Sequence, residues 1–498
     1  MFLGGTAICY ASLSGPCKYP DHVWMAKGAS FESSDRMKPL ECGQCRRELF
    51  HSRLPMRTRI STILLAILAA TMAGCVAHSR QITSPVSKGI EERTGHGLAS
   101  PPRLSVPTIP PGVDLADGLT EDEAVAIALW NNAAFQTDLT ALGFARADLL
   151  EAGLLRNPLL TLLFPIGPKQ METTAIFPIE ILWQRPRRVA AARLDLDRVA
   201  EGLVQNGLNL VRDVQVGYAD LVFAKERASI ATQAVQERAE IAELVEARLR
   251  AGDVSELETS QAQTDARLAE EQATRFKHEV ILARDRLRSL LGLGMDEIPF
   301  EIAPTAEEPP VPEKLDLLIK QALAARPDLR AAELGIEAAG SRAKWEHSRI
   351  MAISAMIDTN SRGQRGFEAG PGLQLELPFF NHNQGGVTRA EAEVERAARH
   401  YAMVRQRIVL EVQEAHTLFL QALESLRAWQ RQILPPLQEN LGQSQKAYAA
   451  GDVSYLFVLE STRRLTDARL REAEAKVSLH RAAAQFQRSV GKKLGSNS

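Results

Sequence analysis

Cysteine is scarce in this chain, and every cysteine lies near the N-terminus. The five are Cys9, Cys17, Cys42, Cys45 and Cys75. A disulfide framework or a cysteine-based metal centre is therefore excluded from the rest of the chain. Cys42 and Cys45 form a CxxC pair, but no second pair completes a zinc site and no βαβ pattern surrounds it. We interpret residues 1–55 as an unstructured extension or a misassigned start, rather than as a metal or redox module.

Aromatic residues are also scarce, and neither acidic nor basic residues are in excess. Phe, Trp and Tyr make up 5% of the chain, and 61 acidic residues face 59 basic ones. This balance provides no electrostatic surface for nucleic acid, and the Ala, Leu, Arg and Glu content suits long helices. No Ser/His/Asp order, P-loop, HExxH or GxGxxG context occurs, and the histidines and methionines show no ligand spacing. We therefore expect no enzyme, no metal site and no bound cofactor.

Long hydrophobic runs are almost absent. The apolar stretch 60–70 follows the basic segment 56–59 and precedes Met72-Ala73-Gly74-Cys75, which is the layout of a secretory signal. Small residues before a cysteine resemble a bacterial lipoprotein cleavage site, although Met72 stands where Leu is preferred. That resemblance implies a signal peptide at 56–74 and a covalent lipid on Cys75; the alternative is an ordinary transmembrane anchor. No later apolar run reaches about 18 residues, so no further spanning helix is expected.

The second half of the chain repeats the first at a spacing of roughly 200 residues. The segment Ala251-Gly252-Asp253-Val254-Ser255 returns as Ala450-Gly451-Asp452-Val453-Ser454. Each copy reads as helix, two short strands, very long helix, helix. One copy alone cannot bury its apolar stripes or close its sheet edges, so the repeat predicts a pseudosymmetric assembly.

The shorter elements can be placed by their boundaries. Residues 76–115 are rich in Pro, Ser and Gly and are expected to form an extended or loosely packed lead-in. Thr120 and Glu123 form a plausible capping box that opens a helix running to about Arg156. Strands are expected at 159–164 and 173–181, and in the second copy at 352–358 and 370–377. Their lengths suit tilted strands of an outer-membrane barrel.

The longer elements are helices. A helix from about Arg187 to Arg250 extends about 95 Å, and a second returns over 255–291. The other copy does the same over 388–449 and 454–490, with a break at Pro435-Pro436. Rods of this length form either a coiled-coil stalk or the wall of a helical tube. The Pro-rich connector 301–314 and the proline break are expected at similar height, as a belt.

Four strands per chain leave open edges, whose unpaired backbone groups each cost several kcal/mol in lipid. The chain is therefore expected to close a barrel by oligomerising. Three copies give about twelve strands, an even number within the known range. The residues alone also permit other ring sizes.

Several segments together resemble the TolC-type outer-membrane efflux proteins, over residues 119–491. They are Ala152-Gly153-Leu154-Leu155-Arg156-Asn157-Pro158, Glu172-Thr173-Thr174, Phe177-Pro178-Ile179-Glu180, Arg187-Arg188-Val189-Ala190-Ala191-Ala192-Arg193 and the twin Gly-Asp-Val-Ser turns. These are similar to the branch serving cobalt–zinc–cadmium type efflux. The resemblance implies a homotrimer of mainly α fold, with a small 12-stranded membrane β-barrel continuous with a periplasmic α-helical barrel. It also implies docking to a periplasmic adaptor and an inner-membrane pump of the resistance–nodulation–division class.

The same resemblance implies roles for particular residues. Adaptor docking falls on the two turns and the residues before them: Arg248, Gly252, Asp253, Ser255, Tyr448, Gly451, Asp452 and Ser454. The alternative is that these residues only make turns, because Gly suits a left-handed helix end and Ser caps the next helix.

The closed aperture is expected just beyond the second turn. Phe457 and Glu460 occupy the matching positions. Glu460 is expected to form a carboxylate ring that faces cations, or else to lie on a solvated helix face. Phe457 departs from the acidic pattern of the family and indicates a hydrophobic constriction instead. Glu256 and Glu258 are weaker candidates in the first copy.

Two further groups flank the strands. Trp183, Phe379 and Phe380 lie just past the strand ends, in an aromatic belt or in ordinary core packing. Arg185, Arg187 and Arg188 are expected to meet lipid headgroups or carboxylates, or to form a solvated patch.

The expected function is a passive exit duct that lies in the bacterial outer membrane, lipid-anchored, and extends into the periplasm. The substrates are expected to be heavy-metal cations; the alternatives are an organic-compound duct of the same fold and a periplasmic coiled-coil adaptor. Val76 after the cysteine, in place of Asp, agrees with outer-membrane sorting. The expected organisation is 1–55 extension, 56–74 signal, 75–118 lipidated lead-in, 119–300 first repeat, 301–314 connector, 315–491 second repeat and 492–498 tail.

Overall fold

The computed structural model describes residues 84–98, 107–164, 166, 170–294, 299–303, 309–363 and 366–492. The chain divides into two units, Met1–His78 and Ser79–Ser498, and every described residue lies in the second. The CxxC pair, the signal 56–74 and Cys75 lie outside the described residues.

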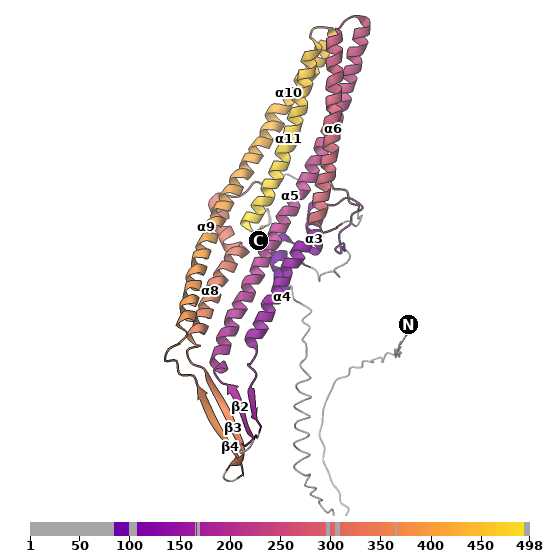
Figure 1. Cartoon of the computed structure of the whole chain (residues 1–498). Helices are drawn as coiled ribbons and strands as arrows, with labels where there is room; N and C mark the ends of the chain where they lie inside the picture. The colour runs from indigo at the N-terminus through magenta and orange to yellow at the C-terminus, as the bar shows by residue number, and fades with distance from the viewer. Residues whose placement is uncertain are drawn as a thin grey trace, which may run out of the picture. The chain divides into compact units, whose positions relative to one another are not determined.

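The elements follow one another in the same order in both halves of the chain (Figure 1). The first half contains α3 Glu121–Asn131, α4 Ala133–Gly153, β1 Leu159–Leu163, β2 Glu172–Pro178, α5 Ile181–Ala251 and α6 Glu256–Leu290. The second contains α7 Leu315–Ala325, α8 Pro327–His347, β3 Ile353–Gly363, β4 Gly366–Leu375, α9 Gln384–Ala428, the π-helix η1 Trp429–Ile433, α10 Leu434–Ala450 and α11 Tyr455–Val490. The expectation of a mainly helical chain with a small sheet is confirmed.

The lead-in is more structured than its composition indicated. Residues Ser84–Thr94 form helix α2, which packs on α5. Val86 and Ile90 lie four positions apart on one helix face and are both fully buried. Gly207 of α5 allows this close approach, because a Cβ there would lie 2.5 Å from Ile90 Cδ1. The expectation of a loosely packed segment is therefore wrong for these eleven residues.

The capping box at Thr120 and Glu123 is confirmed, since each residue bonds the backbone N–H of the other. The helix that it opens does not run to Arg156. It stops at Asn132, whose side chain accepts from Phe135 N at 2.9 Å and caps a new helix, α4. Asn favours this role because its amide competes with the helical backbone bonds. The predicted single helix is therefore two.

The four strands form one antiparallel sheet in the order β1-β2-β3-β4. The two halves meet at β2 and β3, where Thr174 pairs with Asp358 and their side chains bond at 2.7 Å. β1 and β4 each have one edge unpaired among the described residues. Predicted strand 173–181 overran its end, because α5 begins at Ile181, and predicted strand 352–358 was too short.

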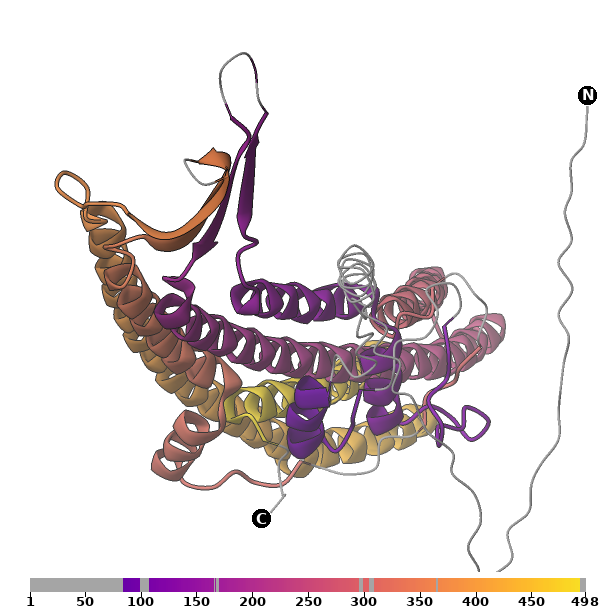
Figure 2. The same ribbon diagram turned by 90° about the horizontal axis from the view of Figure 1, so that it is seen from below.

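The helices form a curved layer, seen along its length in Figure 2. α4 and α6 each pack on α5, whereas α8 and α11 each pack on both α5 and α9. The layer thus consists of four parallel rows of helices. α5 and α9–α10 each form one row, α8 and α11 together form the row between them, and α4 and α6 together form the row on the other side of α5. Its two margins are α4 with α6, and α9 with α10. α5 has 71 residues and extends about 105 Å, so the long first helix is confirmed and begins earlier than predicted.

The break in the second long helix is a π-helix that ends before the predicted Pro435-Pro436. Leu434 N–H bonds Trp429 O, five residues back. Prolines at 435 and 436 supply no N–H to the carbonyls four residues earlier, and the wider turn accommodates this loss. Leu426 and Gln430 line one cavity with Tyr218 of α5, whose hydroxyl lies 2.9 Å from Ala303 O of the connector. The break and connector therefore lie at similar height, as predicted.

Candidate functional site: the paired turns of the helical hairpins

Two helical hairpins, α5/α6 and α10/α11, end in turns at the end of the molecule opposite the sheet (Figure 1). Gly252 and Gly451 adopt φ angles of 85° and 86°. In the first turn, Gly252 N donates to Leu249 O and Asp253 N to Arg248 O, both at 3.0 Å. The second turn repeats this arrangement. Both glycines therefore end their helices in the left-handed conformation, as predicted.

The two serines after the turns differ. Ser255 accepts from Glu258 N at 3.3 Å and caps α6 as predicted. Ser454 occupies the same position before α11, but its side chain makes no capping bond. The predicted cap is therefore confirmed in the first turn and wrong in the second. Ser255, Ser454, Asp253 and Asp452 are all exposed.

The hairpins touch each other just below the turns. Arg248 Nη2 donates to Tyr448 O at 3.0 Å, and its guanidinium lies 4.1 Å from the centre of the Tyr448 ring. Tyr448 is buried in a cluster with Val245 and Tyr455. Burial and the nearby Asp265 carboxylate raise the pKa of Tyr455 to about 12. Tyr448 therefore lies beneath the tip surface, where it positions the turns rather than presenting its ring to a partner.

An ion pair that the sequence analysis missed lies one step further from the tip. Arg463 of α11 pairs with Asp265 of α6, and the Asp265 side chain is 5% exposed. Asp265 sits between Ala262 and Ala269 in the buried stripe of α6. A carboxylate inside an apolar stripe is rarely buried without a cationic partner. The position of Asp265 in the sequence could therefore have predicted a buried ion pair.

The predicted aperture residues are exposed. Phe457 is 57% exposed, and the Glu460 carboxylate pairs with Arg464 of its own helix at 2.7 Å. Glu460 is thus partly neutralised by its neighbour, and the predicted carboxylate ring remains a prediction. Glu256 and Glu258 lie in the first turn of α6, where carboxylates favour the helix dipole.

Two of the arginines after the first strand pair donate hydrogen bonds to backbone carbonyls at the end of α4. Arg185 Nε donates to Gly153 O at 2.7 Å, and Arg188 donates to the carbonyls of Ala152 and Leu154, each at 2.9 Å. They close the C-terminal end of α4, whose last carbonyls lack helical partners. The solvated patch is therefore wrong for the half-buried Arg188, whereas Arg185 and Arg187 are exposed and agree with it. Phe379 and Phe380 are strongly exposed, which contradicts core packing within this chain.

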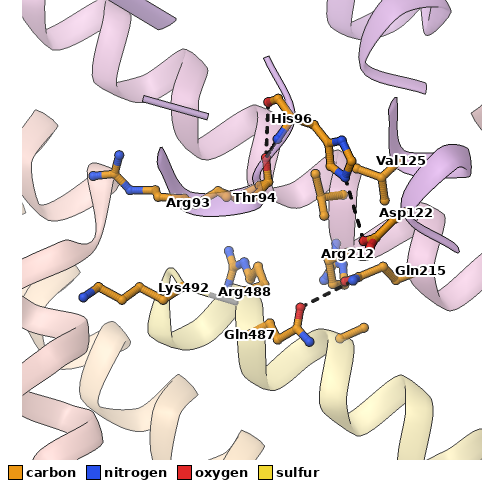
Figure 3. Close-up of a pocket in the computed structure, with 13 residues that line it drawn as sticks. Arg93, Thr94, His96, Asp122, Val125, Arg212, Gln215, Gln487, Arg488 and Lys492 are labelled. Carbon is orange, nitrogen blue, oxygen red and sulfur yellow. Dashed lines mark hydrogen bonds and ion pairs between the residues drawn. The ribbon is translucent and has the colours of Figure 1, made fainter. Parts of the chain in front are cut away.

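A small cavity of about 30 Å³ at the height of α2 was not predicted. Figure 3 shows His96 facing Asp122 and Gln215 facing Gln487 across it. Within the described part of the chain, no cluster of His, Cys, Asp or Glu has the composition to hold a metal ion. No described helix combines the length and apolarity needed to cross a membrane.

Long paired hairpins joined to a small sheet with two open edges define, among the described residues, a mainly helical protein of two similar halves. The family model "Outer membrane efflux protein" matches residues 166–293 and 318–492, and the chain belongs to this family. It is accordingly an outer-membrane efflux protein and not an enzyme.

Individual relatives agree with this placement. The chain is 23% identical to the cobalt-zinc-cadmium resistance protein CzcC of Cupriavidus metallidurans, over 76% of this chain and 91% of that protein. It is 26% identical to the probable outer membrane lipoprotein SilC of Salmonella typhimurium, over 51% of this chain and 58% of that protein. Its fold matches a crystal structure of CusC with a TM-score of 0.65 at 20% identity, over 79% of this chain and 98% of that one.

Proposed function

We propose that the chain is the exit duct of a tripartite efflux system. In this system an inner-membrane pump of the resistance–nodulation–division class and a periplasmic adaptor deliver substrate, which the duct conducts passively. The observation that carries the proposal is the pair of open edges at β1 and β4, continued by the two margins of the helical layer. An open sheet edge is costly in lipid, and a second copy of the chain supplies the missing partner.

The ring that closes these edges is a trimer of two tandem repeats per chain. Three copies place about twelve strands in the membrane, above a helical tube of the same symmetry. The helical margins favour this closure because they expose large apolar side chains. They are Met403 and Leu410 on α9, Phe144 and Leu150 on α4, and Leu268 and Leu282 on α6. Exposed apolar residues of this kind mark interfaces.

The adaptor docks on the two turns. Asp253 and Asp452 are exposed at the hairpin tips, and the Schellman geometry holds them in the same way in both hairpins. Placing a photo-crosslinking residue at Asp253 or Asp452 tests this contact in cells. Crosslinks to the adaptor are expected from both positions and not from Glu395, an exposed residue of α9 far from the tips. Equal crosslinking from all three positions would contradict tip docking.

The substrates are heavy-metal cations, as the name of CzcC indicates for that relative. The second candidate is an organic compound, because a passive duct conducts whatever its pump delivers. Deletion of the gene separates the two. Greater sensitivity to cobalt, zinc or cadmium supports the cation, whereas unchanged metal tolerance with greater sensitivity to drugs supports the organic compound.

The lipid anchor is carried by Cys75, which the name of SilC as a lipoprotein supports by analogy. Mass spectrometry of the mature N-terminus tests it. An acylated Cys75 is expected, and a Cys75→Ser chain is expected to remain unprocessed.

A further inference from the structure

The small cavity at the height of α2 lies where the two halves of the chain meet (Figure 3). From the first half, α2 and α5 contribute Arg93 and Arg212 to its wall. From the second half, α11 and the residues that follow it contribute Arg488 and Lys492. Asp122 of α3 is the single carboxylate among the described residues of the wall. The side chains around this cavity therefore carry more positive than negative charge.

The two central arginines are only partly compensated by carboxylates. Asp213 pairs with Arg212 at 2.7 Å, and Glu411 pairs with Arg488 at 2.6 Å. Glu411 is shared, because it also pairs with the fully buried Arg326. Burial lowers the pKa of Arg488, and the positive charges of its two arginine neighbours act in the same direction. A further negative charge beside Arg488 would reduce this repulsion and favour the charged guanidinium.

Arg93 adds a third positive charge to the same place. Its guanidinium donates to the carbonyl of Gly89 at 2.8 Å and to the carbonyl of Ala325 at 3.0 Å. Both acceptors are neutral, so these bonds do not compensate the charge of Arg93. Glu201 of α5 feels this charge, but it does not line the cavity. The bond to Ala325 also ties α2 to the end of α7, in the second half of the chain.

Arg212 has one buried donor that lacks an acceptor in the described part of the chain. Its Nη1 donates to Gln485 at 3.1 Å and its Nη2 pairs with Asp213, which fixes the guanidinium in place. Its Nε is buried and meets no acceptor among the described residues. Such donors are rare in folded proteins, and a bound water or ion commonly explains them. Among several guanidinium groups an anion fits better than water, because it adds an opposite charge to the hydrogen bond.

The size of the cavity selects among anions. A volume of about 30 Å³ holds one or two water-sized species, which suits a halide such as chloride. Phosphate and sulfate, with several heavy atoms each, are too large for this space.

We propose that the cavity binds one chloride-sized inorganic anion between Arg212 and Arg488, within the positive field of Arg93 and Lys492. The bound ion joins α5 to α11 and thereby links the two halves of the chain. At this height the direct links between the two helices are polar, such as the bond from Arg488 Nε to Asn209 at 2.9 Å. The ion acts within one chain, so the proposal is independent of the proposed function.

Bromide, which replaces chloride and scatters X-rays anomalously, locates the ion directly. Crystals of the full-length protein grown in sodium bromide are expected to show an anomalous peak within hydrogen-bonding distance of Arg212 Nε. A cavity that contains water and gives no anomalous peak would overturn the proposal.

Thermal unfolding in sodium chloride and in sodium gluconate, at equal ionic strength, separates a bound ion from salt screening. Gluconate is too large for the cavity, and a ligand that binds only the folded state raises Tm. The parent is therefore expected to melt about 2–4 °C higher in chloride, and Arg212→Gln is expected to lose this difference. The control Arg481→Gln removes an ion pair with Asp220 between the same two helices and is expected to keep it.

A carboxylate placed in the cavity by substitution should replace the ion. Gln487 lines the cavity and accepts from Gln215 at 3.4 Å, so Gln487→Glu keeps an acceptor there and adds a negative charge. This variant is expected to melt in gluconate near the chloride value of the parent and to gain nothing from chloride. Gln413→Glu adds the same charge on α9, outside the cavity wall, and is expected to keep the chloride effect.

The remaining outcomes decide against the site. An equal chloride effect in the parent, Arg212→Gln and Arg481→Gln would be a general salt effect and would overturn the proposal. A bromide peak without any chloride effect on the parent would mean an adventitious ion only, and would overturn it as well. If Arg212→Gln does not fold, the bromide peak and Gln487→Glu still test the site.

Discussion

Arg326 shows how a single buried charge fixes the place where several helices meet. Its side chain is fully buried, and it pairs with Asp328 at 2.6 Å and Glu411 at 2.5 Å. Burial alone would lower the pKa of this guanidinium, but the bonds and charges of the two carboxylates outweigh it and raise the pKa. Arg488 shares Glu411, so the network joins α7, α8, α9 and α11.

Removing this charge leaves Asp328 without its cationic partner and leaves Glu411 paired with Arg488 alone. We expect Arg326→Ala to lower the free energy of unfolding by about 3–5 kcal/mol. The control Arg330→Ala breaks an exposed pair with Glu333 and is expected to cost about 0–1 kcal/mol. Thermal unfolding followed by circular dichroism compares the two. Equal losses would show that the buried network is not a main source of stability.

His480 predicts a dependence of stability on pH. It lines the belt cavity with Glu226, Lys476 and Glu121, and burial lowers its pKa from the ordinary value of 6.5. The folded protein therefore holds it neutral at pH values where the unfolded chain is already protonated. The free energy of unfolding that the neutral imidazole supports is therefore complete above about pH 6.5 and is lost as the pH falls. His480→Gln is expected to lose less stability than the parent between pH 7.5 and 5.5; parallel losses would contradict the assignment.

At the scale of elements, the helix ends carry the clearest prediction. Gly252 and Gly451 have positive φ angles, whereas Gly442 is helical with open space around its Cα. Gly252→Ala or Gly451→Ala is expected to cost about 1–2 kcal/mol, because a Cβ disfavours the left-handed conformation. Gly442→Ala is expected to stabilise α10 by up to about 1 kcal/mol. Melting temperatures that move in the same direction for all three variants would contradict this reading.

Local sequence signals placed most elements but not the contacts between them. The twin turns, the capping box and the alternation in 370–377 are short-range features, so they could be predicted. The break at Asn132 depends on capping from within a helical pattern, and α2 depends on the glycine at position 207 that receives Ile90. Tyr448 and Asp265 are buried only because two hairpins far apart in sequence pack together. Local periodicity does not determine such partners.

On the scale of the whole molecule, substitutions on the exposed margins can disturb the assembly of several chains without disturbing the fold of one chain. Leu410 is 53% exposed on the free margin of α9, so Leu410→Glu removes little packing within one chain. It is expected to leave the fold intact, as judged by circular dichroism, and to weaken the oligomer because it places a charge in an apolar interface. Gln413→Glu adds the same charge at another exposed position of α9 and serves as the control. An oligomer that survives Leu410→Glu unchanged would remove the α9 margin from the interface.

The central claim is that one chain is an incomplete wall, closed only by further copies. Native mass spectrometry of the detergent-extracted protein, followed by planar-bilayer recording of the same sample, tests this directly. The account predicts a mass of three chains and a stable conductance that disappears when the complex is dissociated. A monomer that stays in solution without its acyl group and detergent, and conducts nothing, would contradict it.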